Sequence, residues 1–364
     1  MDDVARAAAW AALASAGLAT PVAVALLRAF GTPQRVLDAS RASIEAVAGR
    51  ATAERLAARD ASYDAATAAW LAEPGHRLVA WDDAEYPPQL FEISDPPLAL
   101  FALGRLDLLA RASIAIVGSR HATPQGAEDA RAFARMLAEA GLTVVSGLAQ
   151  GIDAAAHRGA LDTPASTVAV TGTGPDRVYP ASHRALAHAI AERGALVTEF
   201  APGMPPLKAN FPRRNRLISG LARGVLVVEA APGSGSLITA RFAVEQGRDV
   251  FAIPGSIHSP LSKGPHRLIR DGAKLVETAQ DVLAELGVAG ATAAGAAGTA
   301  RAATAPGDPL QARVLGAMGR GPVDLDRLVT RTGLAADALA AALVMLELDG
   351  RVAALPGGGW ERLR

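Results

Sequence analysis

The stretch IAIVGSRHATP, residues 114–124, joins an apolar run to a short polar turn and then to a helix start. Its first four residues are apolar and mostly β-branched, as in a strand that is buried on both faces. Thr123 and Pro124 suit the cap and the first position of a helix, because a threonine oxygen accepts from an orphan amide and proline has none to satisfy. The stretch therefore predicts a strand, a tight turn and a helix, in this order.

The same pattern recurs along much of the chain. Further apolar, β-prone runs occupy residues 98–103, 143–145, 167–170, 196–198, 225–228 and 250–253, and helical stretches such as 124–140 and 182–193 separate most of the later runs. Buried strands that alternate with helices predict an α/β fold, in which helices cover both faces of a mostly parallel sheet. Ligands of such folds bind outside the carboxyl ends of the strands, so we look for functional residues there.

Composition divides the chain into four parts. Residues 1–75 carry short helical patterns, two of them opened by Thr20-Pro21 and Thr32-Pro33, and predict a small helical interaction domain of the sterile-alpha-motif or helix-hairpin-helix type. Residues 76–287 form the α/β core, and residues 288–309, rich in Ala, Gly, Thr and Pro, form a flexible linker. Residues 310–364 contain three helical runs and a hairpin pattern, which is the winged-helix layout.

The candidate recognition helix of the last domain, residues 335–349, is acidic. It carries Asp337, Glu347 and Asp349 and no basic residue. Such a helix is repelled by the phosphates that flank the major groove. We therefore expect the winged helix to contact protein, or another part of a dimer, and not to read the sequence of a duplex.

Charge and composition exclude several classes of protein. Basic and acidic side chains are equal in number, so any polyanion site is a local patch. The absence of cysteine excludes disulfides, cysteine-based zinc sites and thiol catalysis, and suits a reducing cytoplasm. The sequence shows no signal pattern and no apolar run of about 18 residues, so we expect a cytoplasmic protein with no membrane contact.

One patch of basic charge stands out, PLKANFPRRNRLISG at residues 206–220. No acidic residue lies between Glu199 and Glu229, whereas that interval contains Lys208, Arg213, Arg214, Arg216 and Arg223. Basic groups around a single aromatic ring, that of Phe211, suit a chain of phosphates with exposed bases. A solvated basic loop that leads into a helix explains the stretch equally well, so its surroundings decide between the two.

Turns at three predicted strand ends offer polar groups. Gly118-Ser119-Arg120 leads toward the helix start at Thr123, and PGSGS at residues 232–236 leads into a helix that carries Arg241. The free amides of both helix starts favour an anion.

In SGLAQGIDAAAH, residues 146–157, the i,i+4 spacing of an aspartate and a histidine predicts either an acid–base pair or, in the interpretation that we favour, an orienting hydrogen bond.

No complete catalytic or cofactor motif is present. Gly172-Thr173-Gly174 lacks the third glycine of a dinucleotide fingerprint, and Pro180 prevents an immediate helix. Neither a serine elbow nor a Walker loop occurs, and the seven histidines lack metal-ligand spacing. We therefore predict no catalytic residue, no metal and no cofactor.

Five ordered motifs together resemble the DNA-processing protein A family, also called DprA or Smf. They are GSRHATPQG (118–126), SGLAQGIDAAAHRGAL (146–161), FPRRNRLISGL (211–221), GSGSLITARFAVEQGR (233–248) and FAIPGS (251–256). The resemblance is dense from residue 77 to residue 286. It implies a Rossmann-like, doubly wound core that binds single-stranded DNA and forms a homodimer. It further implies that the protein protects incoming single strands and loads the RecA recombinase during natural transformation.

The resemblance also assigns site residues. The arginine of the GSR motif is Arg120, and the lysine and ring of a K-x-x-F element are Lys208 and Phe211. Arg214 and Arg216 belong to the basic helix start that follows. The other residues of the implied strand and phosphate site are Gly118, Ser119, Ser146, Gly147, Gly151, Gly233, Ser234, Gly235, Ser236 and Arg241.

Two other functions compete with this one. The core is similar in outline to the cytokinin-activating phosphoribohydrolases, nucleotide-binding enzymes with a P-G-G-x-G-T-x-x-E loop. Here the matching loop is residues 232–237 and Ala240 stands at the position of the glutamate, so Glu229 or Glu245 would have to replace that acid. A winged helix also suits a transcription regulator, which its acidic recognition helix disfavours.

Overall fold

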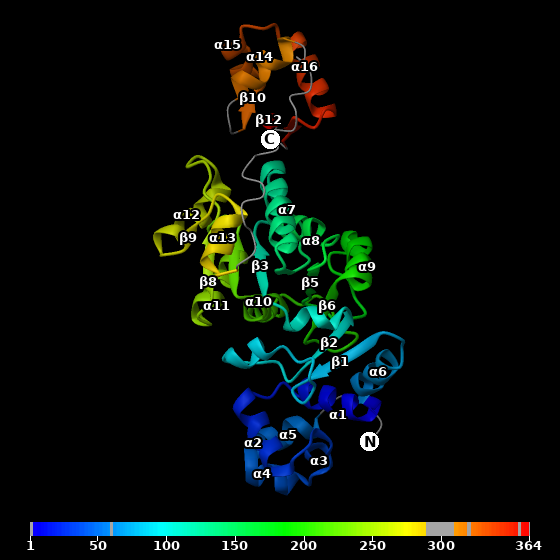
Figure 1. Ribbon diagram of the computed structural model, residues 1–364. Coiled ribbons are helices and arrows are strands. Elements are labelled where there is room, and N and C mark those ends of the chain that lie inside the picture. The colour runs from blue at the N-terminus through cyan, green and yellow to red at the C-terminus, as the bar shows by residue number, and fades with distance from the viewer. Residues whose placement is uncertain (1–2, 59–60, 289–308, 319–321, 356–357, 364) are drawn as a thin grey trace.

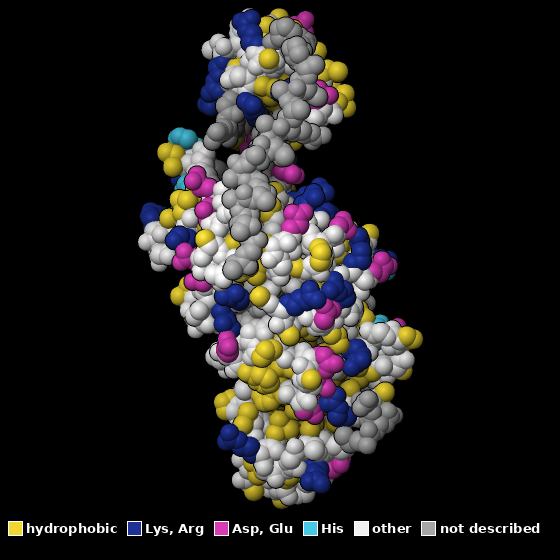
Figure 2. All heavy atoms as spheres, viewed as in Figure 1, with side chains coloured by type: hydrophobic (Ala, Val, Ile, Leu, Met, Phe, Trp, Pro, Cys, Tyr) yellow, Lys and Arg dark blue, Asp and Glu magenta, His cyan; other side chains and the backbone are white. Residues whose placement is uncertain are grey.

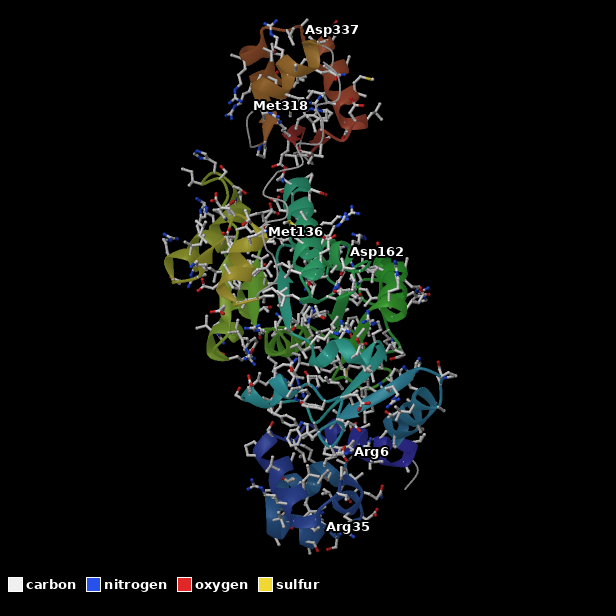
Figure 3. All side chains as sticks on the ribbon, in the orientation of Figure 1. Arg6, Arg35, Met136, Asp162, Met318 and Asp337 are labelled. Carbon is white, nitrogen blue, oxygen red and sulfur yellow. The ribbon has the colours of Figure 1, made fainter. Side chains whose placement is uncertain are left out.

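The computed structural model describes residues 3–58, 61–288, 309–318, 322–355 and 358–363 (Figure 1). A group of helices, an α/β core and a small domain of helices and strands follow one another along the molecule. Arg35 in the first part and Asp337 in the last lie near its opposite ends (Figure 3). The predicted linker, 288–309, lies almost entirely outside the described residues.

The core is built on one sheet of nine strands. Their spatial order is β1 (His76–Ala80), β2 (Ala99–Gly104), β6 (Ala195–Thr198), β5 (Thr167–Val170), β4 (Thr143–Ser146), β3 (Ser113–Val117), β7 (Gly224–Val227), β8 (Asp249–Ala252) and β9 (Lys274–Leu275). All pairings from β6 to β9 are parallel, and β1 and β2 add an antiparallel edge. This confirms the predicted α/β class with a mostly parallel sheet, and it adds the two edge strands β1 and β9, which the sequence analysis does not predict.

Helices cover both faces of this sheet. On one face lie α7 (Pro124–Glu139), α8 (Ile152–Ala160), α9 (Arg184–Arg193) and α13 (Ala279–Glu285), and on the other lie α10 (Asn210–Leu221), α11 (Ser236–Glu245) and α12 (Lys263–Arg270). Strand side chains alternate between the faces: Ile116 packs with Phe133 of α7, whereas Val117 packs with Leu217 of α10. Each such side chain contributes about 1.5–3 kcal/mol when fully buried, which holds the three layers together.

The direction of winding reverses between β3 and β7. From β3 the chain continues outward through β4, β5 and β6, and it then returns to the other side of β3 as β7. Because α7 and α11 cover opposite faces, the loops that follow β3 and β7 diverge. A switch point of this kind is the usual ligand crevice of an open parallel sheet.

Within the part of residues 1–75 that the structure describes, six helices precede the sheet: α1 (Asp3–Ser15), α2 (Thr20–Phe30), α3 (Pro33–Asp38), α4 (Arg41–Ala48), α5 (Arg50–Ala57) and α6 (Ala61–Leu71). Trp10, Leu26 and Trp70 pack in one cluster with Phe101 of β2. The helices therefore bury apolar surface against the antiparallel edge of the core.

One of the two predicted caps in this region is wrong. Thr32 caps α3, and its oxygen accepts from the amide of Arg35 at 3.3 Å. Thr20 instead lies inside α2, after Ala19, and its hydroxyl donates to Oδ1 of Asp95 at 3.0 Å. That distant acceptor could not be read from the local sequence.

The C-terminal part is a winged helix, as predicted. Its helices are α14 (Pro309–Met318), α15 (Leu325–Thr332) and α16 (Ala336–Leu348), and its sheet has the order β10 (Val323–Asp324), β12 (Gly359–Arg362), β11 (Val352–Ala354). Val314, Leu328, Leu343 and Val352 are buried in its core. Within the described residues no single helix is long and apolar enough to cross a membrane, and α15 and α16 reach that composition only as a pair bent by 109°.

Basic side chains do not coat the visible surface. Figure 2 shows Lys and Arg interspersed with Asp and Glu over all three parts of the chain. This distribution fits the zero net charge. A site for a polyanion must therefore be formed by a few convergent residues.

Candidate nucleic-acid interface

Loops at neighbouring strand ends meet the start of α10 in a pocket of about 50 Å³. The loops after β3, β4 and β5 and the first turn of α10 supply its lining, which consists of Arg120, Gly147, Ala149, Gln150, Tyr179, Pro180, Phe211 and Arg214. Four of these residues were predicted from sequence, namely Arg120, Gly147, Phe211 and Arg214. Parallel strands end at one edge of the sheet, which brings these distant segments together.

The side chain of Phe211 lines this pocket and contacts two of its other lining residues. The guanidinium carbon of Arg120 is 5.6 Å from the centroid of the Phe211 ring, within the range of a cation–π contact. Tyr179 lies beside it, with the ring centroids 5.5 Å apart and the planes inclined by 50°. A Cβ on Gly172 would come within 3.2 Å of the Phe211 ring, so that glycine supports the aromatic side chain and does not form a cofactor turn.

Tyr179 was missed by the sequence analysis. It precedes Pro180 in the loop after β5, a polar-looking segment far along the chain from the basic stretch at 206–220. An aromatic residue in a strand-end loop was the only available signal. The exposed fraction of Tyr179 is 45%.

Arg214 forms the buried floor of the pocket. Its Nη1 donates to the carbonyl of Val170 at 2.9 Å, and a Cβ on Gly147 would overlap its guanidinium, so only glycine permits this approach. Burial lowers the pKa of Arg214 to about 10, with the nearby Asp153 opposing the shift and Arg120 adding to it. At neutral pH the guanidinium therefore remains charged.

Asp153 holds the loop beside Arg214. Its Oδ2 accepts from the amides of Gly147 at 3.1 Å and Ala149 at 3.3 Å. Burial raises the pKa of Asp153, while Arg214 and these amides act in the opposite direction. The carboxylate therefore balances the buried arginine and fixes one wall of the pocket.

The predicted pairing of Asp153 with His157 is wrong. His157 is fully buried, its Nδ1 lies 2.7 Å from the hydroxyl of Thr167, and its Nε2 accepts from the amide of Leu148 at 3.3 Å. Burial lowers the pKa of His157 to about 3, so the ring stays neutral. The two residues have separate partners, and His157 is part of the core.

Arg216 does not reach the pocket, in contrast to the site implied by the family resemblance. Its side chain is buried, with Nη2 2.5 Å from Oε2 of Glu199 and Nε 3.3 Å from Oδ2 of Asp95. Arg213 shares Glu199 at 3.1 Å and is half-exposed. Burial raises the pKa of Glu199, while Arg216 and Arg213 act in the opposite direction. Arg216 is therefore engaged in a buried ion-pair cluster.

Lys208 lies in the loop before α10 and is exposed. Among the described residues it has neither a hydrogen bond nor an ion pair. The helix that follows is fixed by Asn210, whose Nδ2 donates to the carbonyl of Gly172 at 3.1 Å. Lys208 is thus an exposed, positively charged side chain, unpaired among the described residues and three residues before Phe211.

Several predicted phosphate residues are framework residues. The amide of Ser119 donates to the carbonyl of Glu229 at 2.6 Å, and the hydroxyl of Ser146 donates to the carbonyl of Ile116 at 2.6 Å inside the sheet. Gly118 packs against Ile152, and Gly151 has a φ of 73° where its backbone abuts the Ser119 carbonyl. These contacts shape the turn that projects Arg120.

The start of α7, predicted as an anion site, is occupied by a carboxylate of the chain itself. Oε2 of Glu229 accepts from the amide of Thr123 at 2.9 Å, and Oε1 accepts from its hydroxyl at 2.7 Å. The Thr123 oxygen in turn accepts from the amide of Gly126. Burial raises the pKa of Glu229, against the effect of both hydrogen bonds from Thr123. A phosphate has no room at this helix start.

Replacing Glu229 with alanine is expected to lower the free energy of unfolding by about 1.5–3 kcal/mol, because two charge-assisted hydrogen bonds and a helix-dipole contact are lost. Urea or thermal denaturation measures this change. Glu245→Ala is the matched control, since Glu245 is exposed and pairs with the exposed Arg241 at 3.1 Å. Equal losses in both variants would contradict this assignment.

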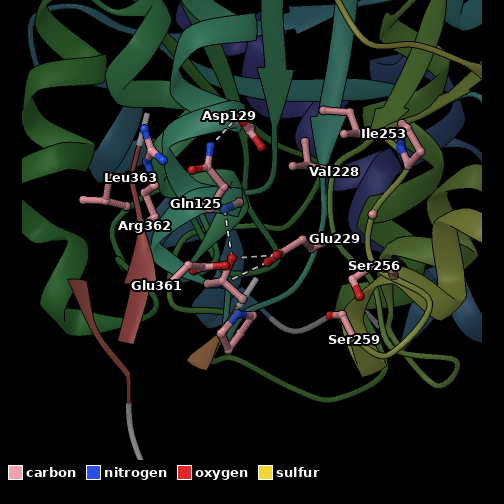
Figure 4. Close-up of a pocket in the computed structure, with 16 residues that line it drawn as sticks. Gln125, Asp129, Val228, Glu229, Ile253, Ser256, Ser259, Glu361, Arg362 and Leu363 are labelled. Carbon is pink, nitrogen blue, oxygen red and sulfur yellow. Dashed lines mark hydrogen bonds between the residues drawn. The ribbon is translucent and has the colours of Figure 1, made fainter. Parts of the chain in front are cut away.

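A larger cavity of about 1040 Å³ lies at the switch point itself (Figure 4). Its walls come from the start of α7, the loops after β7 and β8, and Glu361, Arg362 and Leu363 of the winged helix. The carboxylate of Glu361 accepts from the amide of Gln125, and burial raises its pKa. Its lining holds three carboxyl groups, those of Asp129, Glu229 and Glu361, and one basic side chain, that of Arg362, so the cavity is unsuited to a polyanion.

The glycine-serine loop 233–236 lies apart from the pocket. Gly233 and Gly235 are exposed, the hydroxyls of Ser234 and Ser236 are 2.8 Å apart, and Nδ2 of Asn215 on α10 donates to the carbonyl of Gly235 at 3.3 Å. Arg241 further along α11 faces solvent. The described residues contain no group of three metal-ligating side chains.

Comparison with known proteins gives a consistent result. A model of the family described as DNA recombination-mediator protein A matches residues 77–287, and a model of the DprA winged helix domain matches residues 298–358. The chain is 44% identical to protein Smf of Escherichia coli strain K12 over 299 residues, covering 81% of this chain and 79% of that one. It is 52% identical to DNA processing protein DprA of Streptococcus pneumoniae over 200 residues, covering 55% of this chain and 71% of that one.

Two solved structures are similar as well. The X-ray structure of DNA processing protein A from Streptococcus pneumoniae aligns with a TM-score of 0.66 at 41% identity, covering 75% of this chain and 95% of that one. A structure of DNA processing protein A from Helicobacter pylori, reported for its single-stranded DNA binding mode, aligns with a TM-score of 0.53 at 29% identity. That alignment covers 58% of this chain and 95% of the other.

Proposed function

This chain belongs to the DNA-processing protein A (DprA/Smf) family, and from that premise we propose that it binds single-stranded DNA, protects it, and loads the RecA recombinase during natural transformation. The protein is a DNA-processing, recombination-mediator protein. The strand interface that we propose is the carboxyl edge of its sheet around Phe211.

One observation carries this proposal: an aromatic pair and two guanidinium groups converge at one strand-end pocket. Phe211 and Tyr179 offer π-faces, Arg120 lies exposed over the first ring, and Arg214 adds a buried positive charge. Stacking on rings and contact with phosphates are the two interactions that bind single strands irrespective of sequence. We place Lys208, exposed and unpaired in the described structure, on the phosphate path.

The role of each predicted residue can now be proposed more narrowly. Arg120, Lys208 and Phe211 contact the strand, and Arg214 contributes charge from below. Gly118, Ser119, Ser146, Gly147 and Gly151 shape the loops that hold these side chains. Arg216 belongs to the ion-pair cluster with Glu199. The loop 233–236 and Arg241 contact a part of the bound strand that lies further from the pocket.

Replacing Lys208 with alanine is expected to reduce the salt dependence of strand binding. If roughly four phosphates are neutralised, the slope of log affinity against log salt is about −3, and each lost contact changes it by about 0.7. Fluorescence anisotropy of a labelled strand at several salt concentrations measures this slope. Lys274→Ala is the control, since Lys274 is exposed on β9 and pairs with Glu285 at 2.9 Å. Identical slopes for Lys208→Ala and wild type would remove Lys208 from the interface.

We propose that the protein is not an enzyme of the phosphoribohydrolase kind. Ala240, at the position of the catalytic acid, is buried under the sheet, Glu229 is engaged with Thr123, and Glu245 pairs with Arg241. Neither carboxylate is free to replace the missing one. Release of free base from a nucleoside monophosphate tests this, and a rate above that of the buffer would support the enzymatic alternative.

We further propose that the winged helix binds protein and not duplex DNA. Val344, Met345 and Leu348 are exposed along α16. Its charged side chains are all acidic. Deletion of residues 310–364 is expected to leave binding to duplex DNA unchanged in an electrophoretic mobility assay. A loss of duplex affinity after this deletion would contradict the proposal that the winged helix does not bind duplex DNA.

The remaining parts of the proposal come from the family. We propose a cytoplasmic homodimer that associates through the core of residues 76–287, with residues 1–75 and 310–364 as separate domains joined to it, the latter by the linker 288–309. The RecA step is tested by strand-dependent ATP hydrolysis of RecA on DNA coated with single-strand binding protein. The full chain is expected to shorten the lag before hydrolysis, and an unchanged lag would contradict RecA loading.

A further inference from the structure

Tyr179 is an exposed aromatic side chain in the wall of the arginine-lined pocket. Its exposed fraction is 45%, and the only other aromatic side chain of comparable exposure in the described part of the chain is Phe91, on the 3-10 helix η1 (Pro88–Glu92). Phe91 lines neither of the cavities described above, whereas Tyr179 lies next to Arg120 and Phe211. A large exposed ring therefore lies in the proposed strand-binding pocket, where a base of the single strand could stack on it.

The faces of Phe211 are already partly covered. Arg120 lies over the ring at 5.6 Å, and the backbone at Gly172 packs closely enough that a Cβ there would come within 3.2 Å. Phe211 is accordingly half-buried, although the sequence singled it out as the stacking ring. The neighbouring ring of Tyr179, inclined to it by 50°, presents the more open surface.

The loop that carries Tyr179 is held in place on both sides. Before it, the hydroxyl of Thr173 donates to the carbonyl of Arg177 at 2.8 Å, and the amide of Arg177 donates to the carbonyl of Gly174 at 3.1 Å. After it, Nδ1 of His183 lies 2.9 Å from the carbonyl of Leu148 in the loop after β4. The tyrosine hydroxyl has no partner among the described residues, so no hydrogen bond of its own fixes the side chain.

We propose that Tyr179 is a second stacking platform, which receives the base next to the one that stacks on Phe211. This inference rests on the proposed strand-binding function and adds a residue to it. Successive bases of a single strand stack on successive aromatic side chains, and two rings 5.5 Å apart suit neighbouring bases of an extended strand. Arg120, exposed over the ring of Phe211, meets the phosphate that links the two bases.

Photo-crosslinking of the full chain to oligo(dT) that carries 5-iododeoxyuridine tests this proposal, because iodouracil couples preferentially to rings on which it stacks. Trypsin separates the two candidates, since cleavage after Arg177 and Arg184 releases residues 178–184 and cleavage after Lys208 and Arg213 releases residues 209–213. We expect adducts on both peptides. Tyr179→Ala is expected to lose the first adduct, keep the second, and bind the strand about 5- to 150-fold more weakly with an unchanged salt slope.

Tyr179→Phe separates stacking from the hydroxyl and is expected to keep both adducts and wild-type affinity. Persistence of the Phe211 adduct in Tyr179→Ala shows that the variant remains folded at the site. Adducts confined to residues 209–213, with wild-type affinity in Tyr179→Ala, would overturn the second platform while leaving strand binding intact. Absence of any strand binding by the wild-type chain would overturn the proposed function and this inference with it.

Discussion

Phe211→Ala is expected to weaken binding of single-stranded DNA by about 1–3 kcal/mol, with little change in salt slope, because a lost stacking ring removes no charge. The effect is expected to exceed that of losing one exposed lysine. The ring also supports Arg120 over one face and contacts Tyr179, so its removal disturbs the two neighbours that complete the pocket. Fluorescence anisotropy at several salt concentrations separates the change in affinity from the change in slope.

Phe91→Ala provides the matched control for this variant. Phe91 is half-exposed and contacts two aromatic rings, those of Trp81 and Tyr86, but it lines neither cavity at the carboxyl edge of the sheet. Its truncation removes the same number of ring atoms and should leave strand affinity unchanged. Equal affinity losses in the two variants would mean that a general loss of stability, and not lost stacking, explains the Phe211 result.

Glu199→Ala is expected to lower the free energy of unfolding by about 3–5 kcal/mol, the largest stability effect that we predict. Glu199 is the buried carboxylate that Arg216 and Arg213 share, and its removal leaves the buried Arg216 with only the half-exposed Asp95 as a counter-ion. Chemical denaturation measures the change. Glu139→Ala is the control, because Glu139 forms an exposed pair with Arg135 on α7 that is worth about 0–1 kcal/mol.

A double variant identifies the origin of that loss. In Glu199→Leu/Arg216→Met both members of the buried pair become apolar, so no uncompensated charge remains. This protein is expected to recover most of the stability that Glu199→Ala loses. If the double variant is as unstable as the single one, lost packing explains the effect and the ion pair does not.

The fold was largely predictable because its strands carry a strong local signal. Runs such as Ile114–Val117 are apolar along their whole length, and only a strand covered on both faces suits them. The same rule placed the functional loops, since parallel strands end at one edge. That is why Arg120, Gly147 and Phe211, far apart in sequence, line one pocket in the structure.

The failures have a common physical cause, which is a partner distant in the sequence. The sequence predicts an anion site at the start of α7, but the carboxylate that accepts from Thr123 there belongs to Glu229, 106 residues further along. The family resemblance implies that Arg216 belongs to the strand site, whereas in the structure it pairs with Asp95 and Glu199, which lie on other segments. No local pattern reveals such long-range pairings.

The roles of Ser146 and Tyr179 could not be predicted from sequence for a different reason. Ser146 ends a strand as predicted, but its side chain points into the sheet toward Ile116 and not to the ligand edge, which depends on the register of the strand. Tyr179 lies in a loop whose path across the sheet edge is set by contacts on both sides. In both residues the direction of a side chain, and not the identity of the residue, decides the role.

The proposed strand interface is tested most directly by comparing a labelled oligonucleotide of about 20 nucleotides, longer than the roughly 4–16 nucleotides of a typical single-strand site, with its duplex. The chain of residues 1–364 is expected to prefer the single strand with a salt slope of about −3, and Arg120→Ala/Lys208→Ala is expected to bind more weakly with a slope of about −1.5. The control Arg135→Ala/Lys274→Ala, which removes two exposed charges elsewhere on the core, should behave as wild type. Equal affinity for strand and duplex, or wild-type binding by Arg120→Ala/Lys208→Ala, would contradict the assignment of this edge as the single-strand site.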